Sequence, residues 1–303
     1  MTILCGTDFS DSARLAVRAA AAWARKTKSK LALVHAIDLH GAFALLARVE
    51  GAPIAIDAEL ARWRERAGER LAAEGAFAAT LGIPVETRVL EGAADAAIVA
   101  EAGRTGASLI VVAALGARAG MPFTLGSTAD RVAQAADRAV LVVRDPAPIE
   151  RWAAGGAPLR TLLCMDTTPT AESAAAWTGA LARTGGVDLS ALHVYWPPEL
   201  AQNKGNLTTI AGTGTEAEKK LALGMHAILM RCAPGVSCPL TMIGGLGRVA
   251  DHVAHAAVEK KSELLVVGSH QRGGLKRFWH GSVSHGVIDR APTNVVVVPE
   301  RPR

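Results

Sequence analysis

Two aspartates and two glycine–serine pairs stand at matching places in the halves of this 303-residue chain. Asp8 and Asp166 each end a short apolar run that predicts a buried strand. Gly126-Ser127 and Gly281-Ser282 each open a segment with helical periodicity. The free amides and positive dipole end of a helix start favour phosphate groups. With a carboxylate nearby to hold a sugar or base, these residues predict a phosphate-binding cleft in each half.

Each aspartate also has a purely structural explanation. Asp8 precedes Ser10 and Asp166 precedes Thr168, so either carboxylate could simply cap the helix that follows. Two histidines, His35 and His193, end the apolar runs of the next predicted strands, and we expect them to be hydrogen-bonded structural residues rather than catalysts.

The chain repeats itself at a nearly fixed spacing. Residues 2–8 return at 160–166, an offset of 158, and the His35 strand returns as the His193 strand at the same offset. Residues 109–113 return at 264–268, and Gly126-Ser127 returns as Gly281-Ser282, both at an offset of 155. Two copies of one domain explain this pattern, so the function of each copy has to be argued separately.

Each copy alternates predicted strands with predicted helices, which is typical of an α/β domain with a parallel sheet covered on both faces. Such sheets bind ligands beyond the carboxyl ends of their strands, where the strand order reverses. We predict a first domain at 1–145, a linker rich in Pro, Ala and Gly at 146–158, and a second domain at 159–303.

Composition limits the function classes. Hydrophobic residues make up 50% of the chain, yet no apolar run approaches the roughly 18 residues of a membrane span. The first residues lack a signal-like core, so we expect a cytoplasmic protein without a membrane partner. The net charge of +5 is spread along the chain, which argues against nucleic acid as a partner. The four cysteines fit apolar positions in a reducing compartment.

The sequence resembles the universal stress protein family in its tandem form. The resemblance rests on the strands that end in aspartate, on His35 and His193, and on the loop from Val267 to Ser284. It implies two doubly wound domains, each a five-stranded parallel sheet of order 3-2-1-4-5. It also implies a stress-response role and, in many members, ATP bound through Gly, two residues, Gly, nine residues, Gly and then Ser or Thr.

Neither copy has this motif intact. Its positions are Ala113, Gly116, Gly126 and Ser127 in the first copy, and Gly268, Gln271, Gly281 and Ser282 in the second. Alanine at a strand end adds one methyl group, whereas Gln271 blocks close backbone approach inside the loop. Each copy has therefore lost a different glycine, and we expect ATP, with or without magnesium, in at most one copy.

The resemblance implies that nucleotide occupancy sets conformation or partner choice, and we expect no dedicated enzyme activity beyond slow incidental ATP hydrolysis. The chain has no dinucleotide fingerprint after its first strand, no P-loop and no nucleophile elbow. The alternative is a nucleotide-free interaction protein with degenerate sites. A metal site built on His252 and His255 is a weaker hypothesis, because no carboxylate or cysteine stands at a recognised ligand spacing.

Beyond adenine nucleotide, the partners stay open. The valine-rich last strands, Val140–Val143 and Val295–Val298, are candidates for pairing the two domains within the chain. An unidentified protein partner and a homo-oligomer are both compatible with the sequence.

Overall fold

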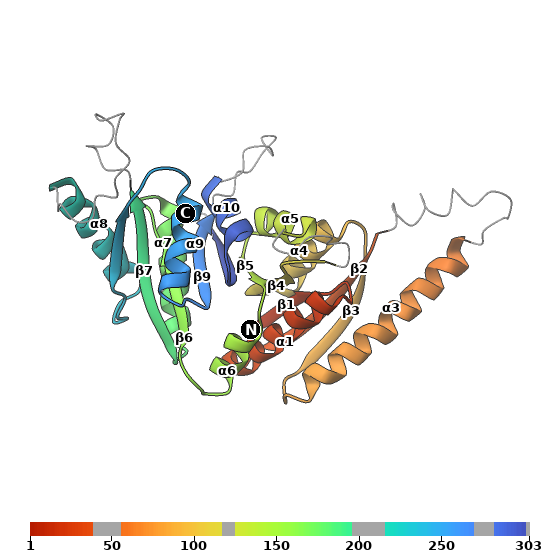
Figure 1. Cartoon of the computed structure of the whole chain (residues 1–303). Coiled ribbons are helices and arrows are strands. Elements are labelled where there is room, and N and C mark those ends of the chain that lie inside the picture. The colour runs from red at the N-terminus through yellow and green to blue at the C-terminus, as the bar shows by residue number, and fades with distance from the viewer. Residues whose placement is uncertain (39–55, 117–124, 196–215, 270–281, 301–303) are drawn as a thin grey trace. The chain divides into compact units, whose positions relative to one another are not determined.

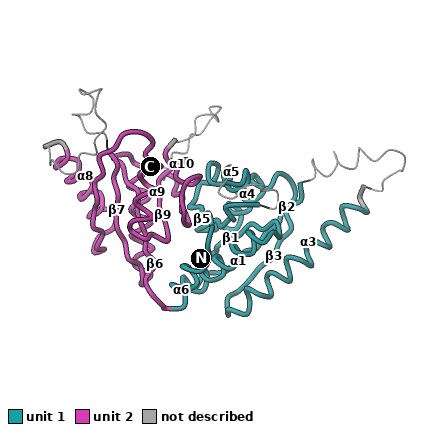
Figure 2. The backbone as a smooth tube through the Cα atoms, in the orientation of Figure 1, with its two compact units in different colours: residues 1–154 teal, residues 155–303 magenta. Residues whose placement is uncertain are grey.

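The computed structural model describes residues 1–38, 56–116, 125–195, 216–269 and 282–300. The chain divides into two compact units, residues 1–154 and residues 155–303 (Figure 2). Each unit alternates strands with helices (Figure 1), which confirms the predicted α/β class and the duplication.

Unit 1 contains a parallel sheet in the order β3-β2-β1-β4-β5. Its elements are β1 (Thr2–Gly6), α1 (Asp11–Thr27), β2 (Lys30–Ile37), α3 (Ile56–Ala79), β3 (Val85–Glu91), α4 (Ala94–Thr105), β4 (Leu109–Ala113), α5 (Ser127–Ala135), β5 (Ala139–Val143) and α6 (Ala147–Ala153). Strand order reverses between β1 and β4, so the carboxyl ends of these two strands mark the expected ligand position.

Unit 2 repeats the arrangement in the order β8-β7-β6-β9-β10, again with parallel pairing throughout. Its elements are β6 (Leu159–Cys164), α7 (Pro169–Ala182), β7 (Val187–Tyr195), α8 (Glu216–Cys232), β8 (Leu240–Gly244), α9 (Val249–Glu259), β9 (Leu264–Ser269), α10 (Ser282–Arg290) and β10 (Asn294–Pro299). The strand order implied by the family resemblance is therefore present in both units.

The central strands form because their side chains are apolar on both faces. All five residues of β5 are buried, and so are the first four of β4. Strands of this kind need helices on each side of the sheet. Right-handed crossovers place α1 and α3 on one face and α4 and α5 on the other. Helix α1 contacts α3, and α4 contacts α5.

Helix α1 has clear start and stop signals. The Ser10 hydroxyl caps its first turn by accepting the Ala13 amide at 3.1 Å, and the helix ends at Lys28 in the left-handed conformation. Alanines on its buried face, including Ala16, Ala20 and Ala24, allow the helix to lie close to the sheet. This cap fixes the direction in which the chain leaves β1 and enters α1.

The predicted linker at 146–158 contains an ordered helix. Pro148 stands in the first turn of α6, where its missing amide is tolerated. Ile149 and Trp152 are fully buried, and the Trp152 ring meets Trp23 of α1 edge-on at a centroid distance of 5.2 Å. Arg18 of α1 binds Glu150 through two hydrogen bonds of 2.8 Å. Unit 1 thus continues to residue 154, beyond the predicted boundary at 145.

No helix among the described residues has the length and apolar character needed to cross a membrane.

Candidate functional site

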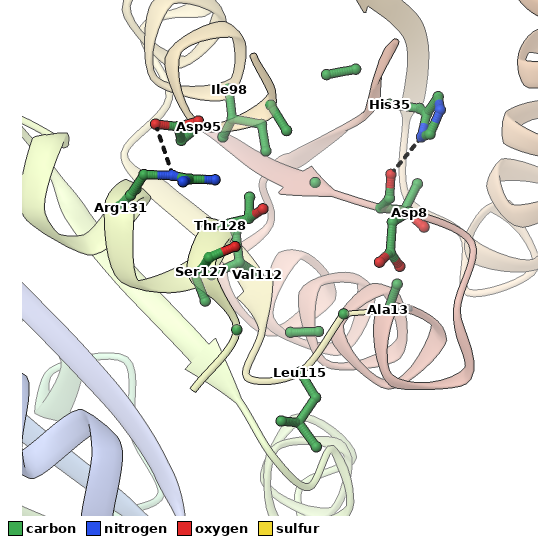
Figure 3. Close-up of a pocket in the computed structure, with 18 of the residues that line it drawn as sticks. Asp8, Ala13, His35, Asp95, Ile98, Val112, Leu115, Ser127, Thr128 and Arg131 are labelled. Carbon is green, nitrogen blue, oxygen red and sulfur yellow. Dashed lines mark hydrogen bonds and ion pairs between the residues drawn. The ribbon is translucent and has the colours of Figure 1, made fainter. Parts of the chain in front are cut away.

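A cleft of about 700 Å³ opens at the carboxyl end of the unit 1 sheet. It lies at the point where strand order reverses, between the ends of β1 and β4, and it extends to the first turns of α4 and α5. Figure 3 shows side chains from all of these elements converging on it. Asp8, Ala113, Gly116, Gly126 and Ser127 all line this cleft, so the structure brings the predicted residues of the first copy together.

Asp8 faces the cleft and also shapes the turn that follows β1. Its Oδ1 atom accepts the Ser10 amide at 3.0 Å and so stabilises the turn, whereas the cap of α1 anticipated for Asp8 is provided by the Ser10 hydroxyl. Its Oδ2 atom lies only 3.0 Å from where a Cβ atom on Gly116 would stand. A side chain at position 116 would therefore press on the carboxylate, and glycine keeps this wall of the cleft open.

Gly126 and Ser127 place the start of α5 at the cleft. Gly126 precedes the first helical residue and donates its amide to the Ala114 carbonyl at 2.7 Å. A Cβ atom on Gly126 would lie 3.3 Å from that carbonyl oxygen and 3.4 Å from the Gly116 nitrogen. The glycine thus lets two backbone segments approach closely, and the first turn of α5 offers amides to an anion.

Ala113 replaces the leading glycine of the motif without distorting the strand. It is the last residue of β4, pairs with Val143 in regular parallel register, and is partly exposed in the cleft wall. The methyl group fits there, as the sequence predicted for a strand end that needs no positive φ.

His35 is held by the backbone, as predicted. Its Nδ1 atom donates to the Thr7 carbonyl at 2.8 Å, and its ring lies 4.4 Å from the Phe9 ring. In unit 2, His193 donates from Nδ1 to the Met165 carbonyl at 2.8 Å. Both histidines therefore tie the second strand of their sheet to the end of the first.

An ion pair in the cleft wall was missed by the sequence reasoning. Arg131 of α5 and Asp95 of α4 approach to 3.3 Å between Nε and Oδ2, and both line the cleft. Figure 3 shows the Arg131 side chain extending from α5 into the cleft, with Asp95 at its edge. The available signal was the spacing, since Arg131 follows Ser127 by four residues and so shares its helix face.

The corresponding positions of unit 2 are packed differently. Asp166 Oδ1 accepts two hydrogen bonds from Thr168, one from its amide at 2.8 Å and one from its hydroxyl at 2.5 Å. The Thr168 hydroxyl lies 2.7 Å from that of Thr170. A Cβ atom on Gly268 would lie 2.7 Å from the Thr170 carbonyl oxygen, so the first turn of α7 lies directly against the end of β9. In this unit the glycine serves helix packing.

Three predicted residues of the second copy are described only in part or not at all. Gln271 and Gly281 lie outside the described residues, and Ser282 is described as the first residue of α10 without its side chain. The α9 histidines proposed for a metal site have other neighbours, because His252 Nε2 lies 2.8 Å from the Leu246 carbonyl and His255 lies 3.3 Å from Glu259.

Comparisons with known proteins agree with this architecture. A universal stress protein of Mycolicibacterium smegmatis is 30% identical over 313 aligned residues, covering 99% of this chain and 97% of the relative. A universal stress protein of Mycobacterium tuberculosis is 33% identical over 138 residues, covering 45% of this chain and 44% of the relative. The crystal structure of a universal stress protein from Archaeoglobus fulgidus matches with a TM-score of 0.73 at 18% identity, covering 99% of this chain and 98% of that one.

The sequence model of the universal stress protein family matches the chain twice, at residues 1–144 and 159–299. Since these two matches and the full-length relative span nearly the whole chain, the protein belongs to the universal stress protein family and consists of two family domains in tandem.

Proposed function

We propose that the cleft of unit 1 binds an adenine nucleotide, and that its occupancy governs a stress-response role rather than steady turnover. The observation that carries this proposal is the convergence of Asp8, Gly116 and Gly126 on one cleft of about 700 Å³. This volume falls within the range of roughly 300–1,000 Å³ found for small-molecule sites.

The residues present fit the two ends of a nucleotide. Close approach at Gly116 and Gly126 admits a polyphosphate to the first turn of α5, where the Ser127 hydroxyl and the backbone amides are donors for its oxygens. On the other side, the Asp8 carboxylate is an acceptor for ribose hydroxyls or the adenine amino group. A bound nucleotide would supply the negative charge of its phosphates. The α5 amides and the Ser127 hydroxyl would orient the phosphates, and Asp8 would orient the sugar or base.

A binding role is favoured over catalysis by the chemistry of the lining. Among the cleft residues that the structure describes there is no lysine or cysteine, and the histidine among them, His35, already donates to Thr7. The described lining therefore offers no amine or thiolate as a nucleophile, and its carboxylates, hydroxyls and helix-start amides are suited to binding. Hydrolysis in this cleft would then be slow and incidental.

We infer that unit 2 binds nucleotide more weakly than unit 1. Thr168 already donates twice to the Asp166 carboxylate, and α7 lies against β9 at Gly268, whereas the corresponding Ala113 of unit 1 lines the cleft. The expected asymmetric occupancy therefore favours the first copy.

Isothermal titration calorimetry of the full chain with ATP, ADP and AMP, with and without magnesium, tests the proposal. We expect one site per chain. Asp8→Asn should weaken binding about tenfold, because it keeps the acceptor for Ser10 but replaces the other carboxylate oxygen, an acceptor for the ribose or adenine, by an amide donor. The matched variant Asp166→Asn should leave the affinity unchanged. Absence of binding to the wild-type chain would refute the function, and a loss only in Asp166→Asn would reverse the assignment of the site.

A second candidate function is binding of an apolar ligand or peptide without nucleotide. It is favoured by a groove of about 420 Å³ between α1 and α3, whose lining includes Phe9, Val17 and Phe77. Phe77 is 47% exposed, which is high for a large apolar side chain. The same titrations separate the two candidates, because Asp8 lines the cleft and not this groove, so binding in the groove would be insensitive to Asp8→Asn.

A further inference from the structure

The Asp95–Arg131 ion pair of unit 1 stands at two positions that carry no charge in unit 2. The offset of 155 that relates the later parts of the two units carries Asp95 onto Ala250 and Arg131 onto Gly286. Backbone geometry supports this offset, since Gly92 and Gly247 both have positive φ, at 109° and 94°. At these two positions unit 2 has an alanine and a glycine, and its ion pair between α9 and α10 joins Asp251 to Arg290 at 2.8 Å instead.

The replacement changes how the two helices meet. A Cβ atom added to Gly286 would lie 2.9 Å from the Ala250 Cβ atom, so α9 and α10 touch at this point. In unit 1 two long polar side chains occupy the same place, and both line the cleft. Unit 1 therefore carries an arginine at the cleft where unit 2 has Gly286, and the arginine of the unit 2 ion pair stands four residues later, at Arg290.

Arg131 is directed toward the position expected for a phosphate. Long side chains on a helix lean toward its N-terminus, so Arg131 projects over the turn that begins at Ser127. In Figure 3 its guanidinium extends toward the middle of the cleft, while its Nε atom faces Asp95. The rest of the guanidinium fork is then oriented toward an anion held at the start of α5.

The charges around the cleft make this cation important. Three carboxylates line it, those of Asp8, Asp38 and Asp95, and Arg131 is the sole arginine or lysine among the lining residues that the structure describes. Among these charged side chains, that of Arg131 alone offsets the repulsion that the carboxylates exert on an entering phosphate. A nucleoside without phosphate has no such requirement.

The ion pair itself is easily exchanged. Arg131 is 56% exposed and Asp95 is 23% exposed, and pairs this close to solvent contribute little to stability. A phosphate offers the guanidinium two parallel charge-assisted hydrogen bonds, which are stronger and geometrically matched. Asp95 therefore competes with a ligand phosphate for the same cation.

We propose that Arg131 is the phosphate-selecting residue of the unit 1 cleft, and that Asp95 holds it in the empty site and gives it up to the ligand. This inference rests on the proposed nucleotide binding and adds the ligand class: phosphate-bearing nucleotides are selected over nucleosides. It also defines two states of the α4–α5 contact, with the Asp95–Arg131 pair closed without ligand and open with it.

Titrations of ATP and adenosine into four full-length proteins test the inference: wild type, Arg131→Gln, Asp95→Asn and the double variant. We expect Arg131→Gln to weaken ATP binding about tenfold and to leave adenosine binding unchanged. Asp95→Asn should strengthen ATP binding by about threefold, because it removes the competitor and one repulsive charge. The double variant should behave like Arg131→Gln.

The opposite signs distinguish ligand contact from a merely structural pair. If the ion pair only fastened α4 to α5, both single variants would break it, and ATP affinity would fall in both. That result, or an unchanged ATP affinity in Arg131→Gln, overturns the inference and leaves nucleotide binding itself intact. If wild type binds neither ATP nor adenosine, the inference and the proposed function both fail.

Arg104→Gln is the matched control. Arg104 also is 56% exposed and pairs with an acidic residue, Glu101, but it does not line the cleft. We expect this variant to bind ATP and adenosine as wild type does. A tenfold loss of ATP binding in this variant would show that net charge, rather than the position of Arg131, controls the affinity, and would also overturn the inference.

Discussion

The two units share one fold and differ in the residue near the end of the fourth strand, which is Ala113 in unit 1 and Gly268 in unit 2. In unit 2, α7 lies against the end of β9, with Gly268 allowing the Thr170 backbone to come within contact distance. In unit 1 the same strand position is Ala113, and the space beside it belongs to the cleft. Unit 1 thus accommodates a methyl group at the strand position where, in unit 2, a methyl group would press on the Thr170 backbone.

This comparison changes what the motif glycines mean. Unit 2 keeps the leading glycine of the phosphate motif, yet the structure uses Gly268 for close packing of a helix. Unit 1 has lost that glycine and still has Gly116 and Gly126 beside an open cleft. Glycine allows another group to come close to its own backbone. That group can be a ligand or another part of the chain.

The largest expected effect tests whether the cleft depends on packing that belongs to unit 1 alone. Trp152→Ala should destabilise unit 1 by about 3–5 kcal/mol, because it empties a fully buried site between α6 and α1. Hydrogen exchange read by mass spectrometry should show faster exchange in peptides from residues 1–154, with those from 155–303 unchanged. Equal loss of protection in both units would show that they unfold together, and the comparison would then lose its per-unit basis.

The next effect addresses the helix–strand contact directly. Gly268→Ala should destabilise unit 2 by about 1–3 kcal/mol, since the new methyl group meets the Thr170 backbone, which cannot rotate away. The reciprocal change, Ala113→Gly, should alter unit 1 by no more than about 1 kcal/mol. Urea unfolding followed by the same peptide-resolved exchange measures both. Equal effects in the two units would mean that α1 and α7 are packed alike.

The sequence predicted the fold and the part of the candidate site that is formed by strand ends and helix starts. Alternating apolar strands and helices, repeated at a fixed offset, predicted two doubly wound units, and the family resemblance supplied the strand order that the structure has. Strand ends and helix starts placed Asp8, Gly116 and Gly126 at one edge of a sheet, where they line one cleft. Parallel topology dictates this, because the carboxyl ends of the strands lie together.

Contacts between helices could not be predicted from the sequence in the same way. Asp95 and Arg131 meet because of the crossing geometry of α4 and α5, which the periodicity of each helix does not specify. The Pro, Ala and Gly content of residues 146–158 predicted a linker, so the helix α6 was not predicted. Its signal was the spacing of Ile149 and Trp152, which places two large apolar residues on one face.

The smallest expected effect is a difference in acid sensitivity between the units. Glu101 of unit 1 has a side chain only 7% exposed, and two hydrogen bonds join its carboxylate to Arg104. The hydrogen bonding lowers the pKa of the Glu101 carboxyl below its usual value, although burial opposes the shift. At the same offset of 155, unit 2 has the buried Ala256, which cannot titrate.

The direction of that pKa shift decides whether the stability of unit 1 rises or falls with pH. Because the folded pKa of Glu101 lies below the unfolded value of about 4.3, the stabilisation is complete above that value and is lost as the pH falls through the folded pKa. We expect this contribution to be small, since Arg104 is largely exposed. Peptide-resolved exchange between pH 6 and pH 3 should show unit 1 losing protection before unit 2, and Glu101→Gln should reduce that difference. If unit 2 loses protection first in the wild-type chain, the buried carboxylate is not what separates the acid stability of the two units.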